Sequence, residues 1–203
     1  MRIAKEGYPL IIAAASVGLV AFFLGWQPIA VLAAAIALVL GGFFRDPERR
    51  PPRGEGLVVA PADGRIVALR NAGEMGTQVS IFLSPLDVHV NRSPIDGAVE
   101  QARYERGKFH AAFRDKASQY NERNTIDLVS PRGKRLRVVQ IAGVLARRIV
   151  CYVKPGDSLQ AGQRFGLIMF GSRVDLFIPV GAEIRVSEGQ RVRAGETIVG
   201  RLP

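Results

Sequence analysis

The sequence is poor in the residues that build disulfides, metal clusters and aromatic surfaces. Of its 203 residues only one is cysteine, Cys151, two are histidine and one is tryptophan. A single cysteine excludes an internal disulfide and a cysteine-rich metal centre, so we predict a protein without metal in a reducing compartment. The scarcity of aromatic residues, together with the lack of a helix-turn-helix, zinc-finger or ribonucleoprotein motif, argues against nucleic acid as a partner.

Charged side chains are missing from one long stretch near the N-terminus. The 38 residues that precede Arg45 include no Asp, Glu, Lys or Arg, and one transmembrane helix needs only about 20 residues. Gly-Trp-Gln-Pro at residues 25–28 interrupts the stretch near its middle. We therefore predict a membrane-anchoring helical hairpin over residues 1–44, with arms at 9–25 and 29–44, which form either two short spans or a re-entrant loop.

A cleavable signal peptide is the alternative for this stretch. The apolar region is too long for one, lacks a clear small-residue cleavage site and continues into a second arm. Basic residues flank the hairpin on both sides, with two before it and four after it: Arg2, Lys5, Arg45, Arg49, Arg50 and Arg53. The positive-inside rule then predicts attachment to the cell membrane, with the remainder of the chain on the cytoplasmic side.

Acidic side chains are outnumbered throughout the chain, whose formal net charge is +10. A basic surface beside a membrane anchor favours anionic lipid headgroups as neighbours, each nearby Lys or Arg contributing about 1 kcal/mol. We predict an anionic membrane surface as a partner of this protein.

A charged, proline-rich hinge at residues 45–56 separates the hairpin from a second domain over residues 57–203. Its composition resists continuation of a helix. Short runs rich in β-branched residues and split by glycines follow: 57–59, 65–69, 78–83, 98–104, 125–129, 136–142 and 146–153. This rhythm predicts an all-β sandwich or barrel.

The C-terminal quarter contains an internal repeat. Residues 156–166 recur 33 positions later as residues 189–200, with one extra residue before the last glycine. The pattern resembles the hammerhead-type β-sandwich of biotinyl and lipoyl carrier domains. Those carriers present a lysine at a hairpin tip, whereas residues 167–186 contain none. We therefore predict a mainly β body of this sandwich type without carrier function.

A Gly-Ser dipeptide follows an apolar strand within residues 167–175, Leu-Ile-Met-Phe-Gly-Ser-Arg-Val-Asp. Alone, this dipeptide is typical of a strand-to-turn junction. Three further segments accompany it: Ala-Pro-Ala-Asp-Gly at 60–64, Phe-Leu-Ser-Pro-Leu-Asp-Val-His-Val-Asn-Arg at 82–92, and Lys-Ala-Ser at 116–118 with Asn-Glu-Arg-Asn at 121–124. In this order the four segments resemble motifs of the phosphatidylserine decarboxylase family, and Gly-Ser-Arg resembles its short type.

The resemblance implies a proenzyme that cuts itself between Gly171 and Ser172 and converts Ser172 into a pyruvoyl group. Residues 1–171 would become a membrane-bound β chain and residues 172–203 an α chain, held together as a heterodimer; whether heterodimers assemble further is left open. The pyruvoyl group would form a Schiff base with phosphatidylserine, and loss of carbon dioxide would yield phosphatidylethanolamine.

Self-cleavage needs a hydroxyl beside a flexible peptide bond and a base to deprotonate it. Glycine at position 171 allows the Ser172 hydroxyl to approach the preceding carbonyl. His89, within the second matched segment, is the candidate base, and the family's Asp-His-Ser charge relay implies that Asp63 orients it. Arg92 stands where longer family members have a second histidine, and we predict that it binds an anionic group of the substrate.

The other histidine, His110, lies outside the core of the matched motifs, and we interpret it as a structural or surface residue. It is open whether His89 serves self-cleavage, decarboxylation or both. Two other functions compete with this interpretation. One is a noncatalytic, membrane-tethered hammerhead adaptor, which would stay intact, and the other is a pyruvoyl decarboxylase of a soluble amino acid, which would have no need of a membrane anchor.

Overall fold

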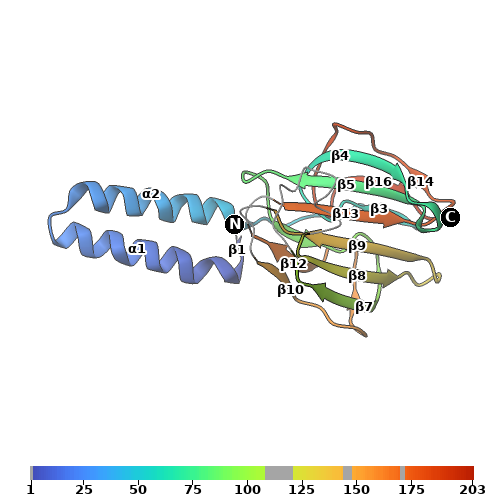
Figure 1. Ribbon diagram of the computed structural model, residues 1–203, viewed down its shortest axis with the longest axis horizontal. Coiled ribbons are helices and arrows are strands. Elements are labelled where there is room, and N and C mark those ends of the chain that lie inside the picture. Colours follow the sequence, from blue (N-terminus) through green and yellow to red (C-terminus); the bar gives the residue numbers. More distant parts are fainter. Residues whose placement is uncertain (1, 108–120, 144–147, 170–171) are drawn as a thin grey trace. The chain divides into compact units, whose positions relative to one another are not determined.

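The computed structural model describes residues 2–107, 121–143, 148–169 and 172–203. The chain divides into two compact units, Met1–Glu48 and Arg49–Pro203 (Figure 1). The division falls within the predicted hinge at residues 45–56.

The N-terminal unit consists of helices α1 (Tyr8–Phe23) and α2 (Gln27–Phe43) with a short strand pair, β1 (Arg2–Ile3) and β2 (Arg45–Asp46). Each helix has a proline in its first turn, where the missing N–H costs no hydrogen bond. The helices approach closely at Gly18, because a Cβ there would lie 3.3 Å from the Ala33 Cβ.

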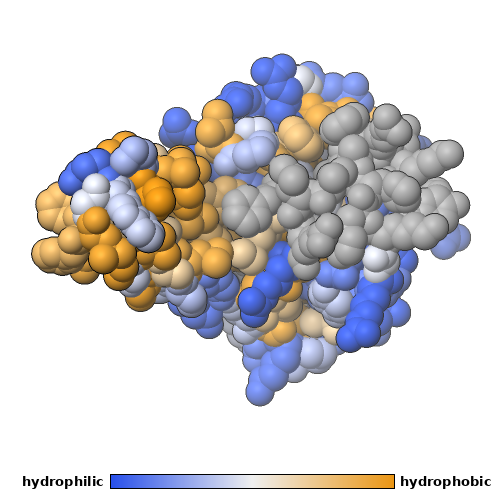
Figure 2. Space-filling model, turned by 60° about the vertical axis from the view of Figure 1, so that its left-hand side comes forward, coloured by the Kyte–Doolittle hydropathy of each residue, from blue (hydrophilic) through white to orange (hydrophobic). Residues whose placement is uncertain are grey.

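The outward surface of this unit is strongly apolar. Large hydrophobic side chains along both helices are more than two-fifths exposed, among them Ile12, Phe22, Val31 and Leu38, and Figure 2 shows the unit as mainly hydrophobic. Within the described chain, the helical stretch Lys5–Phe23 is long and apolar enough to cross a membrane, whereas α2 is shorter. The N-terminal helix favours association with a membrane.

The C-terminal unit is built around an eight-stranded antiparallel sheet with the order β11-β7-β8-β9-β13-β5-β4-β15. The strands, in the same order, are Ser158–Leu159, Gly97–Glu105, Arg123–Val129, Arg135–Ile141, Ser172–Ile178, Thr77–Leu83, Gly64–Asn71 and Arg191–Val192. The sheet curls, so that one face encloses the core (Figure 1). The prediction of a mainly β body is confirmed.

Two three-stranded sheets and a short 3-10 helix, Gly73–Met75, complete the regular structure in the described part of this unit. One has the order β10-β12-β6, with strands Ile149–Cys151, Arg164–Ile168 and Val90–Arg92. The other has the order β14-β16-β3, with strands Glu183–Ile184, Ile198–Arg201 and Leu57–Val59.

Successive side chains of β13 point alternately to the two faces of the eight-stranded sheet. Val174, Leu176 and Ile178 are fully buried members of the main apolar core, together with Ile81 of the neighbouring strand β5. Because side chains on a strand alternate, Ser172 belongs to the same core-facing row.

The two copies of the internal repeat have the same local structure. Each contains a positive-φ glycine, a two-residue strand, a second positive-φ glycine and a longer strand. The second glycines, Gly162 and Gly195, meet each other, because a Cβ on Gly195 would lie 3.1 Å from the Gly162 Cα. The repeat therefore brings two equivalent turns into contact.

Candidate active site

Ser172 is the first residue of β13 and lies opposite Leu83, the last residue of β5. Its side chain is fully buried. Among the described residues, the Ser172 hydroxyl oxygen has no hydrogen-bond partner. A buried hydroxyl without a partner is costly, and this cost is typical of a group kept for chemistry.

His89 lies at the end of the segment that leaves β5 and enters β6. It is fully buried, and its ring Nδ1 lies 2.9 Å from the carbonyl oxygen of Asp87. Because a carbonyl oxygen can only accept, Nδ1 must carry the proton, and in the neutral ring Nε2 is then the basic nitrogen. The histidine is thus held in the tautomer that suits a general base.

The two ends of the segment from Leu83 to His89 hold the two ends of the predicted cleavage segment. Leu83 pairs with Ser172, and the Ile168 N–H donates to the His89 carbonyl at 3.3 Å. Ile168 ends β12, so only three residues separate it from Ser172. The last of these, Gly171, lies outside the described residues. Ser172 and His89 are therefore brought to the same edge of the core.

Asp63 directly precedes β4, and its carboxylate has other partners than expected. Arg49 Nη2 donates to Oδ2 at 2.7 Å, and the Ala194 N–H donates to Oδ1 at 2.8 Å. Arg49 Nη1 also donates to Glu196 at 3.0 Å. The expected hydrogen bond from His89 is not among those that Asp63 makes. In this structure the Asp87 carbonyl orients the histidine instead.

Burial raises the pKa of Asp63 above its ordinary value of 3.8, while the Ala194 N–H and Arg49 act against this rise. Sequence reasoning missed Arg49 and Glu196. It counted Arg49 among the basic residues that flank the hairpin, whereas the structure buries its side chain against two carboxylates. The only available signal was the position of Arg49 in a hinge between two domains.

The Asn-Glu-Arg segment lies at the same edge, where β8 begins. Asn124 Nδ2 donates to Gln140 Oε1, and Gln140 Nε2 donates to Asn91 Oδ1, each at 2.8 Å. All three side chains are buried. This chain of amides links β8, β9 and β6 beneath the edge. Lys116, Ala117 and Ser118, the other part of this matched segment, lie outside the described residues.

Strand register places all four matched segments at one edge of the large sheet. A single row of paired residues crosses five strands there: Arg65, Phe82, Arg173, Ile141 and Arg123. Arg65 follows the Asp-Gly turn, Phe82 opens the histidine segment, Arg173 follows Ser172, and Arg123 belongs to the Asn-Glu-Arg segment. Segments more than 100 residues apart in sequence thus form one candidate site.

Comparison with known proteins shows the family of this chain. The sequence model of the family described as phosphatidylserine decarboxylase matches residues 36–200. A phosphatidylserine decarboxylase proenzyme of Symbiobacterium thermophilum is 48% identical, covering 99% of this chain and 96% of the relative. Proenzymes of the same name from Geotalea uraniireducens and Magnetococcus marinus are 45% and 47% identical, covering 99% and 98% of this chain and 97% and 95% of their own.

The chain belongs to the phosphatidylserine decarboxylase family. Members of this family are carboxy-lyases made as proenzymes, and a pyruvoyl prosthetic group is the general expectation for them. The expected family is confirmed, and the adaptor alternative is not favoured.

Arg92 of this family member is also buried and lies where the two repeat turns meet. Its Nη1 donates to the Gly162 carbonyl at 2.9 Å, and a Cβ on Gly195 would lie 3.1 Å from the Arg92 Cδ. The same added Cβ would lie 3.7 Å from the Arg49 Cβ. Two arginines, Arg92 and Arg49, therefore flank one turn beside Asp63.

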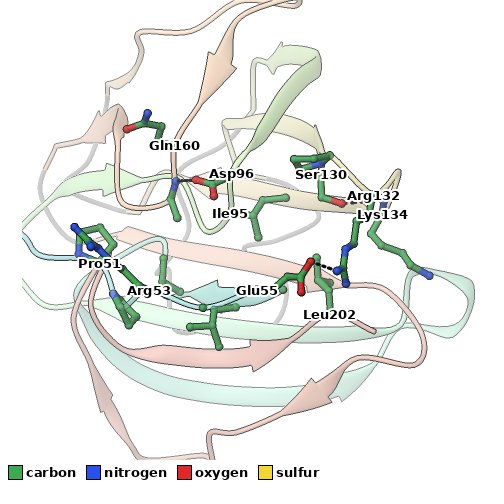
Figure 3. A pocket seen from close by; sticks show the side chains of 17 residues that line it. Pro51, Arg53, Glu55, Ile95, Asp96, Ser130, Arg132, Lys134, Gln160 and Leu202 are labelled. Carbon is green, nitrogen blue, oxygen red and sulfur yellow. Dashed lines mark hydrogen bonds and ion pairs between the residues drawn. The ribbon is translucent and has the colours of Figure 1, made fainter.

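A cavity of about 700 Å³ lies elsewhere in the body of this decarboxylase family member (Figure 3). It is lined by the turn between β8 and β9 at Ser130–Lys134, by Ile95 and Asp96, and by residues 51–57. That turn stands at the far end of β8 and β9 from Ile141, about 20 Å away along the strands. None of the motif residues that the structure describes lines the cavity, so we do not assign it to the reaction.

Proposed function

We propose that this chain is a phosphatidylserine decarboxylase proenzyme that cleaves itself between Gly171 and Ser172. Residues 1–171 become the β chain, and residues 172–203 become the α chain with a pyruvoyl group at position 172. One observation carries the proposal: the buried Ser172 begins a strand at the edge where four family motifs converge. The two chains stay together as a heterodimer, because β13 of the α chain is paired on both sides with β5 and β9 of the β chain.

His89 is the proposed base for self-cleavage. Its Nε2 accepts the proton of the Ser172 hydroxyl, whose oxygen attacks the Gly171 carbonyl; the peptide C–N bond breaks and an ester forms. Loss of the Ser172 α-proton then expels the Gly171 carboxylate. The dehydroalanine that remains takes up water and releases ammonia, which leaves a ketone at position 172.

The residues around Ser172 fit a pyruvoyl group. Ser172 is fully buried, opposite Leu83 and two residues before Val174, and both of these belong to the apolar core. A ketone, unlike a hydroxyl, carries no donor that needs a partner. A pyruvoyl ketone supplies an electron sink for decarboxylation of a bound amino acid headgroup. The apolar surroundings favour loss of the substrate carboxylate as neutral carbon dioxide.

Asp63 and Arg92 are proposed to support the reaction from the neighbouring turn. Asp63 is the family's candidate for orienting the histidine, and for this task it must exchange Arg49 or Ala194 for His89. Arg92 is proposed to bind the phosphate or carboxylate of the headgroup. Its support is its position three residues after His89, together with the charge that it brings into the protein interior.

We further propose that α1 and α2 insert into the cell membrane, with both ends and the catalytic body on the cytoplasmic side. Their support is the exposed apolar surface and the basic residues on either side. Arg49 is not counted among the basic residues that favour this orientation, because its charge is paired with Asp63 and Glu196. An anionic membrane surface is the expected partner. The body is proposed to be a hammerhead-type sandwich, on the support of the two repeat turns that meet at Gly162 and Gly195.

Denaturing gel electrophoresis of the purified protein tests this function. We expect two fragments that separate near residue 171, with the mass of the small one showing a pyruvoyl N-terminus, and a Ser172→Ala variant that remains whole. An uncut wild-type chain at 22.0 kDa would contradict self-cleavage and favour the adaptor.

The substrate is tested with the cleaved protein. We expect carbon dioxide release from phosphatidylserine in vesicles and none from free serine. Release from serine alone would instead identify a decarboxylase of a soluble amino acid.

A further inference from the structure

Ser172, the first residue after the predicted cleavage site, is followed by a buried arginine, Arg173. Along β13, Ser172 and Val174 face the apolar core, so Arg173 and Asp175 face the opposite side of the sheet. Arg173 is nevertheless only 2% exposed. A buried arginine needs a partner that compensates the loss of its hydration.

Arg173 and Asp175 form a two-point ion pair. Arg173 Nε donates to Asp175 Oδ1 at 2.6 Å, and Nη2 donates to Oδ2 at 3.2 Å. This paired geometry matches the planar fork of the guanidinium to the two carboxylate oxygens. The pair is therefore specific in its geometry as well as in its charge.

Two polar side chains of β5 tie this ion pair to the neighbouring strand. Arg173 Nη2 donates to Ser80 Oγ at 2.8 Å, and Gln78 Nε2 donates to Asp175 Oδ2 at 2.9 Å. Ser80 is the direct partner of Asp175 in the strand register. Both contacts form in the register that also places Ser172 opposite Leu83.

Register matters here because a slip of one residue would turn Ser172 away from the core and away from the edge where His89 lies. A buried ion pair adds little net stability compared with apolar residues of similar volume. Its best attested use is to select one register. Self-cleavage also removes the peptide bond before Ser172, so the new end of β13 is then held only by its own and lateral contacts.

We propose that Arg173 is a positioning residue for Ser172, acting through Asp175 and Ser80; this inference rests on the proposed self-cleavage. By holding the start of β13 in register, it aligns the Ser172 Cα–H and Cβ–O bonds for elimination. The ester has two fates. Elimination releases the Gly171 carboxylate and leads to pyruvoyl and ammonia, whereas attack of water on the ester gives the same carboxylate and an α chain that begins with an intact serine.

The test is the mass of the α chain in an Arg173→Met variant. A pyruvoyl end is lighter than a serine end by one ammonia. Misplacement by about 1 Å slows a reaction on the order of 10²-fold, so elimination in the variant should slow by that factor and the serine-ended product should accumulate. Arg173→Lys keeps the charge but not the fork, and it should restore pyruvoyl formation in part.

An Arg173→Met and Asp175→Leu double variant separates positioning from folding. It leaves no unpaired buried charge, so it should fold, yet it lacks the tie to Ser80 and should still give serine-ended α chain. The matched control is Arg137→Met, which removes an ion pair with Asp127 between strands β9 and β8, whose arginine side chain is 35% exposed. This control should give only pyruvoyl.

Full pyruvoyl formation at the wild-type rate in both the single and the double variant would overturn the proposal. A wild-type chain that stays uncut would instead overturn the proposed function itself. The two failures are therefore distinguishable in one experiment.

Discussion

Leu83 and Ser172 are direct partners across strands β5 and β13. Leu83 also begins the segment that runs to His89. At the other end of this segment, the Ile168 N–H donates to the His89 carbonyl, and Ile168 precedes Ser172 by four positions. The predicted cleavage bond thus lies between Ile168 and Ser172, which are bound by the two ends of the segment Leu83–His89.

Replacing His89 by glutamine tests the proposed base. A general base contributes about 10²–10⁴-fold to a rate, so self-cleavage should slow by a factor in this range, followed on a denaturing gel over time. Any cleaved fraction should then be assayed for decarboxylation, which shows whether His89 also serves the second reaction. His110→Gln is the matched control and should cleave like the wild type. Equal cleavage by both variants would exclude His89 as the base.

Arg49→Gln should shift the pH dependence of self-cleavage. Burial raises the pKa of Asp63, and Arg49 is one of the groups that hold it down. Without Arg49 the pKa rises further, and a larger share of Asp63 is protonated at any acidic pH. If the ionised carboxylate is required, the acidic limb of the cleavage rate should move to higher pH.

Arg49→Lys is the control for this shift, because it keeps a positive charge near Asp63. Its acidic limb should lie between those of the wild type and Arg49→Gln. Three superimposable pH profiles would show that Asp63 ionisation does not limit cleavage.

Gly64→Ala should prevent folding of the precursor. Gly64 has φ of +150°, and a Cβ there would lie 2.1 Å from the Phe82 carbonyl oxygen. The close approach brings the Asp-Gly turn against β5, so that Asp63 can reach the site. We expect a loss of more than about 4 kcal/mol of stability, seen as insoluble protein or a collapsed unfolding midpoint in detergent.

Gly133→Ala serves as a control that separates the steric clash of an added Cβ from the cost of placing alanine at positive φ. Gly133 also has positive φ, +73°, but a Cβ there meets nothing within 4 Å. It should cost about 1–2 kcal/mol from the backbone alone. Both variants should be measured on the uncleaved Ser172→Ala chain, and equal losses would contradict the role of the Phe82 contact.

A chain that comprises only residues 49–203 should still cleave itself but lose its attachment to membranes. All four motifs and Arg49 are retained in this compact unit, whereas the exposed apolar helices are removed. Cleavage is read on a gel, and attachment by sedimentation with phosphatidylserine vesicles. Undiminished sedimentation would assign membrane binding to the basic body and not to the helices.

Many of the helices and strands could be predicted from the sequence, because the patterns that indicate them are local. A 38-residue stretch without charged side chains predicts membrane helices independently of the rest of the chain. Runs of β-branched residues between glycines likewise predict strands. The observed strands Leu57–Val59 and Thr77–Leu83 coincide with predicted runs to within one residue. The four motifs, with Ser172 and His89, were likewise visible as local patterns.

The sequence alone determined the composition of the site, its family and the likeness of its two repeats. Only the tertiary structure decided which groups meet. Asp63 binds Arg49 and the Ala194 N–H rather than His89, and Arg173 is buried although arginine is usually exposed. The physical reason is that these contacts join strands distant in sequence, such as Arg49 and Glu196, 147 residues apart. Such partners are selected by sheet register and burial, which no local pattern records.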